Sequence, residues 1–274
     1  MQGSVAWTPP VGTLGQIVGE VRSRLEDLSR NHAHLARAAA EAPVPPSLSS
    51  ALRSSGSVSV IAEIKRRSPS KGWIRAEISA ADRALAYEAG GAIGISVLTE
   101  PLHFAGSADD LAAVRAAVRI PVLKKDFHIE PIQLLEARAC GASAALLIAR
   151  ALSPAQLQRM IQSAQEIGIE VVVEVRTDEE LDRALDYGAA MIGVNNRNLE
   201  TLKIAKETGE RLVPRVPPEM IAIAESGVGT AADVRVAGGW GADAVLVGST
   251  LSDAADPRAA VRALSGIPRR RRHG

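Results

Sequence analysis

Residues 58–72, VSVIAEIKRRSPSKG, decide the fold class, because a short apolar run leads there into ionisable residues at its end. Successive side chains of a strand point to opposite faces, so Glu63 and Lys65 would share one face. Burying either charge is unfavourable unless it is paired or takes part in chemistry. The segment therefore predicts a buried strand whose carboxyl end carries a functional site.

Runs of this kind recur along the chain, and each is followed by an amphipathic helical pattern. They begin near Val58, Ala92, Pro121, Ser143, Glu170, Ala190, Glu219 and Asp243. These eight starts spread over 185 residues, about 26 per unit, which fits a strand, a helix and two loops. Eight such units predict an α/β fold, a single (β/α)8 TIM barrel. An open, doubly wound sheet is the alternative, and the absence of a nucleotide fingerprint disfavours it.

The loops that return from helix to strand resemble one another. Each carries a glycine followed by an alanine, at Gly91-Ala92, Gly141-Ala142, Gly188-Ala189 and Gly241-Ala242. Glycine there supplies the left-handed residue that ends a helix. We interpret these pairs as structural and assign them no chemistry.

Three regions follow from these patterns. Residues 1–57 predict an N-terminal helical extension and linker, with apolar residues at helical spacing from Leu14 and a Pro- and Ser-rich stretch before the barrel. The (β/α)8 barrel occupies residues 58–264. Residues 265–274 are basic, and we expect them to form a flexible tail.

Composition excludes several classes of protein. The chain has 274 residues, 46% hydrophobic and 23% charged, as in ordinary globular proteins. The net charge is +1, and without Arg269–Arg272 it would be −3, from 28 basic and 31 acidic residues. Neither balance suits a nucleic-acid-binding protein. Cys140 is the single cysteine, and neither a signal peptide nor an apolar run long enough for a membrane span is evident. We expect a cytoplasmic protein with neither nucleic-acid nor membrane partners.

The ends of the predicted strands gather charged side chains. Active sites of this fold lie at the carboxyl ends of the strands. Two lysines and three glutamates occur there, which predicts a catalytic site: Lys65, Lys125, Glu63, Glu174 and Glu225. The same ends supply Asn195, Arg197 and Ser226.

Each of these residues also has a structural interpretation. Glu63 and Lys65 could form an ion pair, although a buried pair often stabilises no more than apolar side chains would. Glu174 could cap a loop amide, but it follows three valines in a closed barrel. Alternation turns Lys124 away from the interior, so we expect it to be solvated.

The last two strand ends predict a phosphate site. Loops after the seventh and eighth strands of this fold commonly bind phosphate. Ser226–Gly229 and Gly248–Thr250 offer backbone N–H groups and hydroxyls there. The stretch GVGTAA matches a dinucleotide fingerprint only in part, so a phosphate monoester is the better ligand. The five histidines are scattered, and we expect neither a metal nor a cofactor.

Seven motifs, in order, resemble those of indole-3-glycerol phosphate synthases over residues 14–264. They are IAEIKRRSPSKG (61–72), SVLTEPLHFAGS (96–107), PVLKKDF (121–127), VVVEV (171–175), GVNNRNLET (193–201), IAESGV (223–228) and LVGSTL (246–251). The resemblance implies closure of the pyrrole ring of a carboxyphenylamino-deoxyribulose phosphate, with loss of carbon dioxide and water, in tryptophan biosynthesis. It also implies that the extension covers the barrel mouth.

The resemblance further implies roles for individual residues. Lys125 would be the general acid of the condensation, and Lys65 would bind the substrate carboxylate and could serve in dehydration. Glu174 would be the general base, and Glu63 would hold Lys125 and the substrate hydroxyls. Substrate contacts would come from Asn195, Arg197, Glu225, Ser226 and Phe104, and phosphate contacts from Ser68, Gly227, Gly248 and Ser249.

One departure from the family pattern and two rival interpretations bear on this resemblance. Asn198 stands where the family usually has Asp; asparagine can still cap a helix but lacks the charge. Rival interpretations are another phosphate-binding barrel, such as a tryptophan- or histidine-pathway isomerase, and a non-catalytic scaffold barrel. The isomerases use Cys/Asp or Asp/Asp pairs, whereas lysines and glutamates occupy the strand ends here. We expect a monomer or a weak homodimer.

Overall fold

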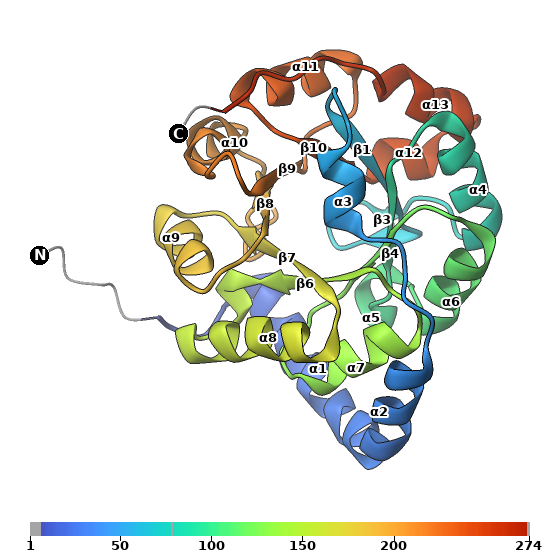
Figure 1. The fold of residues 1–274 in the computed structure, drawn as a ribbon, viewed down its shortest axis with the longest axis vertical. Helices are drawn as coiled ribbons and strands as arrows, with labels where there is room; N and C mark the ends of the chain where they lie inside the picture. The colour runs from blue at the N-terminus through green and yellow to red at the C-terminus, as the bar shows by residue number, and fades with distance from the viewer. Residues whose placement is uncertain (1–6, 78, 273–274) are drawn as a thin grey trace, which may run out of the picture.

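The computed structural model describes residues 7–77 and 79–272, which form a closed barrel ringed by helices (Figure 1). All eight barrel strands are parallel, and each begins within two residues of its predicted start. They are β1 (Ser59–Ile64), β4 (Gly94–Leu98), β5 (Val122–Lys125), β6 (Ala144–Ile148), β7 (Glu170–Val175), β8 (Met191–Asn195), β9 (Ile221–Glu225) and β10 (Ala244–Val247). The ladder runs from β4 through β5 to β10 and closes through β1. The predicted (β/α)8 TIM barrel is confirmed.

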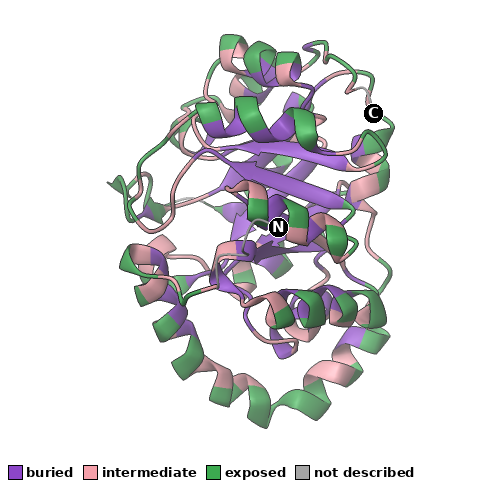
Figure 2. Ribbon diagram, turned by 90° about the vertical axis from the view of Figure 1, so that its left-hand side faces the viewer, coloured by how far each residue is buried: buried purple, intermediate pink, exposed green. Residues whose placement is uncertain are grey.

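Helices follow the strands and cover the outside of the barrel. Their outward faces are exposed, whereas the strands are almost wholly buried (Figure 2). The outer helices are α4 (Ala80–Gly90), α6 (Ala108–Ala117), α7 (Ile132–Ala139), α8 (Pro154–Ile167), α9 (Asp178–Asp186), α10 (Glu207–Leu212), α11 (Ala231–Trp240) and α13 (Pro257–Leu264). Shorter elements are α5 (Pro101–Phe104), α12 (Ser249–Asp253), and the 3-10 turns η1 (Ala149–Ala151) and η2 (Val213–Arg215). No helix in the described parts of the chain is long and apolar enough to cross a membrane.

The repeated glycines end helices as predicted. Gly91 after α4 has φ +99°, and Gly241 after α11 has φ +97°. Gly141 and Gly188 also have positive φ, at +79° and +81°. This left-handed conformation is one that side-chain-bearing residues rarely adopt. Each glycine lies between the end of a helix and the start of the next strand, so these loops lie at the amino ends of the strands, away from the site.

The N-terminal extension holds three helices, α1 (Gly12–Arg30), α2 (His32–Glu41) and α3 (Leu48–Arg53), and only α1 lies at the mouth. α2 packs along α7, where Arg138 donates to two carbonyls just after α2. α3 closes the opposite end of the barrel and lies in front of the strands in Figure 1. Glu170, at the start of β7, accepts hydrogen bonds from the first turn of α3 at 2.7 and 3.1 Å. The expectation that the whole extension covers the mouth is therefore wrong for α2 and α3.

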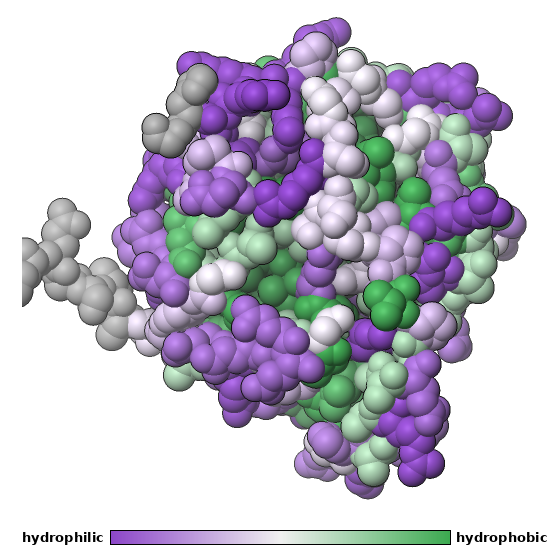
Figure 3. Space-filling view, in the orientation of Figure 1, coloured by the Kyte–Doolittle hydropathy of each residue, from purple (hydrophilic) through white to green (hydrophobic). Residues whose placement is uncertain are grey.

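The expectation of a flexible C-terminal tail is also wrong for the described residues 265–272. Ile267 is buried, and its carbonyl accepts the backbone N–H of Val58 at 2.8 Å. Arg269 and Arg272 both pair with Asp243, which precedes β10. Figure 3 shows hydrophilic side chains around this segment and α10. Both arginines thus bind Asp243 at the amino end of the barrel, and Arg272 also donates to backbone carbonyls there. His273 and Gly274 lie outside the described residues.

Candidate active site

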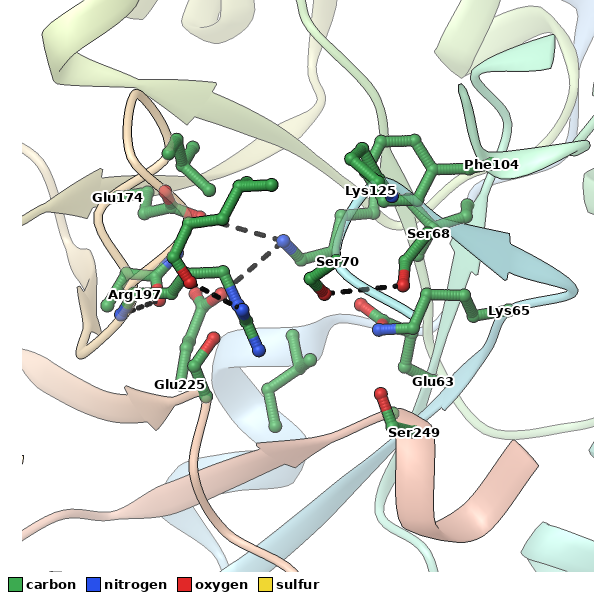
Figure 4. Close-up of a pocket in the computed structure, with 18 of the residues that line it drawn as sticks. Glu63, Lys65, Ser68, Ser70, Phe104, Lys125, Glu174, Arg197, Glu225 and Ser249 are labelled. Carbon is green, nitrogen blue, oxygen red and sulfur yellow. Dashed lines mark hydrogen bonds and ion pairs between the residues drawn. The ribbon is translucent and has the colours of Figure 1, made fainter. Parts of the chain in front are cut away.

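A cavity of about 360 Å³ opens at the carboxyl ends of the barrel strands (Figure 4). Its volume lies in the range of small-molecule sites. Every residue that the sequence predicted for the site lines it: Glu63, Lys65, Ser68, Phe104, Lys125, Glu174, Asn195, Arg197, Glu225, Ser226, Gly227, Gly248 and Ser249. The barrel thus brings together side chains that are up to 186 residues apart in sequence.

Lys125 lies between two buried carboxylates at the centre of this cavity. Its Nζ is 3.6 Å from Oε2 of Glu174 and 3.5 Å from Oε2 of Glu225 (Figure 4). Burial opposes the charge of Lys125, but Glu225, Glu174 and Glu63 outweigh it and raise its pKa. Burial raises the pKa of Glu225 to about 8, against the opposing effect of Lys125. The ammonium therefore keeps its proton, while a proton can reside on the carboxylate beside it.

Glu63 pairs directly with Lys65, and its charge also helps to raise the pKa of Lys125; its role in holding Lys125 and the substrate hydroxyls stays a prediction. The Lys65 Nζ donates to Oε1 of Glu63 at 2.7 Å. The alternation of β1 brings both side chains to one face, as predicted. A side chain on Gly248 would overlap the Glu63 carboxylate, so glycine leaves the space for this pair. Glu225 takes the place by Lys125, and Gly193 leaves room for its carboxylate.

Lys124 is buried, although the sequence analysis expected it to be solvated. Its side chain points outward from the barrel, but it is only 2% exposed because α7 covers it. There its ammonium forms an ion pair with Glu136 of α7. Alternation along β5 correctly separated the two lysines; it could not show that the outer one lies beneath a helix.

The loops after β9 and β10, which the sequence predicts to bind phosphate, both line the cavity. Ser226 and Gly227 have φ +63° and +78°, and the Ser226 carbonyl accepts the side-chain amide of Asn196 at 2.9 Å. Gly248 and Ser249 begin α12 at the same side of the cavity. Backbone N–H groups at such turns favour anionic ligands. Every group expected to bind phosphate therefore faces one cavity.

Ser68 reaches the cavity on a hairpin that the sequence did not predict. Strands β2 (Arg67–Ser68) and β3 (Gly72–Trp73) pair antiparallel just after β1. Ser68 is buried and its Oγ accepts the N–H of Lys71 at 3.2 Å. Trp73 is exposed, and the Arg67 guanidinium lies 5.7 Å from its ring centroid. Two-residue strands leave too short an alternation to detect in sequence.

Apolar side chains form another part of the cavity wall. Phe104 of α5 and Phe127 after β5 have ring centroids 6.1 Å apart. Leu14 and Ile17 of α1 line the cavity beside them. Their spacing predicts an amphipathic helix, but periodicity does not show what the apolar face of that helix packs against. Asp126, next to Lys125, also lines the cavity and was not among the predicted site residues.

Arg197 and Asn198 occupy the loop after β8. Arg197 Nη1 donates to the Leu202 carbonyl at 2.8 Å, and burial lowers the pKa of its guanidinium. Asn198 Oδ1 accepts the N–H groups of Glu200 and Thr201 at 2.8 and 3.1 Å. No helix begins at this loop, all of which the structure describes, so Asn198 caps a turn and the expected helix-capping role is wrong.

Comparison with known proteins agrees with this geometry. The sequence model of the family "Indole-3-glycerol phosphate synthase" matches residues 14–264. The chain belongs to the indole-3-glycerol phosphate synthase family. These enzymes are carboxy-lyases of tryptophan biosynthesis. The indole-3-glycerol phosphate synthase of Mycolicibacterium gilvum is 51% identical over 223 residues, 81% of this chain and 82% of that protein. The family's enzyme from Mycobacterium leprae is 52% identical over 224 residues, 82% of each chain.

More distant solved structures share the barrel of this indole-3-glycerol phosphate synthase family member. The 3-hexulose-6-phosphate synthase of Salmonella typhimurium superposes with a TM-score of 0.61 at 17% identity, covering 76% of this chain and 97% of that one. Thiamine phosphate pyrophosphorylase of Pyrococcus furiosus gives 0.58 at 16% identity, covering 76% and 94%. At such identities the likeness supports the fold alone.

Proposed function

We propose that this cavity converts 1-(2-carboxyphenylamino)-1-deoxyribulose 5-phosphate to indole-3-glycerol phosphate. The observation that carries the proposal is the Lys125 ammonium, held between Glu174 and Glu225 in the same cavity as the Glu63–Lys65 pair. Ring closure and dehydration both need proton donors next to proton acceptors, and this arrangement supplies two such sets.

In the condensation step, Lys125 is the general acid. It donates a proton to the ketone oxygen while the ring carbon that bears the carboxylate bonds to the ketone carbon. The carboxylate then leaves as carbon dioxide, and its bonding electrons restore the aromatic ring. Lys65 provides the cationic contact for that carboxylate before it leaves. The raised pKa of Lys125 keeps it protonated for this task.

In the dehydration step, the new hydroxyl leaves as water and a proton leaves the neighbouring CH2 carbon. Lys65 donates a proton to the departing hydroxyl, and Glu174 is the base that takes the carbon-bound proton. Glu63 holds the Lys65 ammonium at 2.7 Å and so aims it. Lys65 and Glu174 lie at the ends of β1 and β7, so they reach the intermediate from different sides of the cavity.

The remaining lining residues hold the substrate. We assign the phosphate to Ser68, Gly227, Gly248 and Ser249, which combine hydroxyls with turn N–H groups. Phe104 contacts the aromatic ring, and Asn195, Glu225 and Ser226 contact the substrate hydroxyls. Arg197 contacts an anionic group of the substrate.

An assay with purified protein tests the proposal directly. Addition of the carboxyphenylamino-deoxyribulose phosphate should generate indole fluorescence, with carbon dioxide released in equal amount. The Lys125→Ala variant is the matched control, because it removes the central acid and leaves the other lining groups. Absence of product from folded, unaltered protein would refute the proposed function.

We also propose a division of the chain and a location. The barrel, residues 58–264, carries the chemistry, and α1 of the extension covers the site. The position of Thr13, Leu14 and Ile17 in the cavity wall supports this. The free thiol of Cys140 is in keeping with a reducing, cytoplasmic location. We propose a monomer or weak homodimer, with the phosphorylated small molecule as its ligand and neither nucleic acid nor membrane as a partner.

A further inference from the structure

We propose that Thr99 and Asp126 are positioning residues that fix the end of β5, and thereby hold Lys125 and Phe127 in their working places. This inference rests on the proposed function, to which it adds two residues that touch no reacting atom in the scheme above. Both lie in the loops that follow neighbouring strands, β4 and β5.

Thr99 fastens the end of β5 at two points. Its N–H donates to the carbonyl of Lys125 at 3.1 Å, which continues the β4–β5 ladder one bond beyond the last residue of β4. Its hydroxyl donates to Oδ2 of Asp126 at 2.5 Å. One residue thus holds both the backbone of the proposed general acid and the side chain that follows it.

Asp126 transmits this constraint to the next residue. Its Oδ1 accepts the N–H of Phe127 at 2.8 Å, and the Phe127 carbonyl accepts from Nε2 of Gln133 at 3.0 Å. Thr99 and Asp126 are 5% and 8% exposed, so water cannot readily replace either bond. Burial opposes the Asp126 charge, but Lys124, His128 and Thr99 outweigh it, and its pKa is lowered. Asp126 therefore stays an ionised acceptor.

The loop after β4 is anchored just as firmly. Glu100, the neighbour of Thr99, is fully buried, and its carboxylate accepts three N–H groups in the first turn of α5. α5 carries Phe104, which faces Phe127 across the cavity wall. The Thr99–Asp126 bond thus joins two rigid loops into one block that carries Lys125 and both aromatic rings.

Loss of the hydroxyl would leave a buried carboxylate oxygen without its donor. A buried group that loses its hydrogen-bonding partner destabilises the folded state. The Asp126 carboxylate can rotate to find another donor. Because it also accepts the N–H of Phe127, the backbone beyond Lys125 must then shift with it. Small displacements of a proton donor reduce the rate of the chemical step strongly, by up to roughly 100-fold for about 1 Å.

The test is Thr99→Val, which keeps the branched shape and the backbone N–H and removes only the hydroxyl. We expect kcat to fall roughly 10- to 100-fold with KM within about 3-fold of the parent value, at a temperature well below unfolding. Thr99→Ser, which restores the hydroxyl, should return kcat to within about 3-fold of the parent.

Ser143→Ala is the matched control, because the Ser143 hydroxyl also binds β5, at the end opposite Lys125. Ser143 is buried, and its hydroxyl accepts the N–H of Val122 at 3.1 Å, at the amino end of β5. This variant should lower the melting temperature and leave kcat unchanged. If Thr99→Val likewise lowers only the melting temperature and keeps the parental kcat, the positioning role is refuted.

Two further results separate the possible failures. A parent protein that forms no product refutes the proposed function, whereas an active parent with an equally active Thr99→Val refutes only the positioning role. If Thr99→Val does not fold, Asp126→Asn carries the test, because its amide can accept one bond but not both. Parental kcat in folded Asp126→Asn would likewise overturn the inference.

Discussion

Replacing Arg272 with alanine should destabilise the protein without affecting its catalysis. Arg272 is only 4% exposed in its side chain, although it is the last residue of the basic run that begins at Arg269. Its guanidinium donates to the carbonyls of Val216 and Met220, at 3.0 and 2.6 Å, and to that of Gly241. It also pairs with Asp243 at 2.8 Å. All four partners lie near the amino ends of β9 and β10, opposite the cavity.

The magnitude follows from these contacts. Hydrogen bonds to a charged group contribute about 1.5–3 kcal/mol each, but water at the edge of the barrel can replace some of them. Asp243 also keeps its pair with Arg269. We therefore expect a loss of about 2–4 kcal/mol in the free energy of unfolding, and a melting temperature lower by about 5–10 °C.

Thermal unfolding followed by circular dichroism measures this effect. Arg271→Ala is the matched control, because Arg271 is exposed and carries the same charge one residue away. The control should melt within about 1 °C of the parent protein. If both variants melt alike, the docked C-terminal segment contributes no stability and the reasoning from its contacts is refuted.

Three further substitutions, in or next to the site, give testable predictions. Lys124→Met should lower the melting temperature through the uncompensated Glu136 charge and keep most of the activity, because the side chain lies outside the barrel; a loss of turnover comparable to that of Lys125→Ala would contradict this. Gly248→Ala should reduce kcat/KM at least about 100-fold by displacing the Glu63 carboxylate from Lys65, and an unaltered rate would show that the pair is dispensable. Because the pKa of Glu225 is raised to about 8, the folded state holds its proton above the ordinary carboxyl range, so this group's contribution to stability falls as pH rises from about 4.5 to 8. Glu225→Gln should flatten that slope and remove an inflection near pH 8 from the pH profile of kcat/KM, and a profile identical to the parent's would argue against it.

The repeating pattern of strand and helix was sufficient to predict the barrel. Buried parallel strands leave continuous apolar runs, and the runs beginning near Val58 and Asp243 mark the first and last strands within a residue. The candidate site followed from the same logic, since the carboxyl ends of parallel strands converge. Alternation also distinguished Lys125 from Lys124.

Pairing within the site could not be predicted, because it depends on distances across the barrel. The family resemblance assigned Glu63 to Lys125, whereas the barrel places Glu174 and Glu225 there; the Glu63–Lys65 pair was only one of two interpretations that alternation allowed. The docked Arg272 was missed for a related reason. A run of arginines resembles a solvated tail unless the position of Asp243 is known.

The most decisive measurement is the turnover of Lys125→Ala. We expect a folded protein, with the circular dichroism of the parent, whose kcat/KM for ring closure is lower by about 10²- to 10⁴-fold. Retention of more than a tenth of the parental kcat/KM by this variant would contradict the claim that the ammonium between Glu174 and Glu225 is the acid of the reaction.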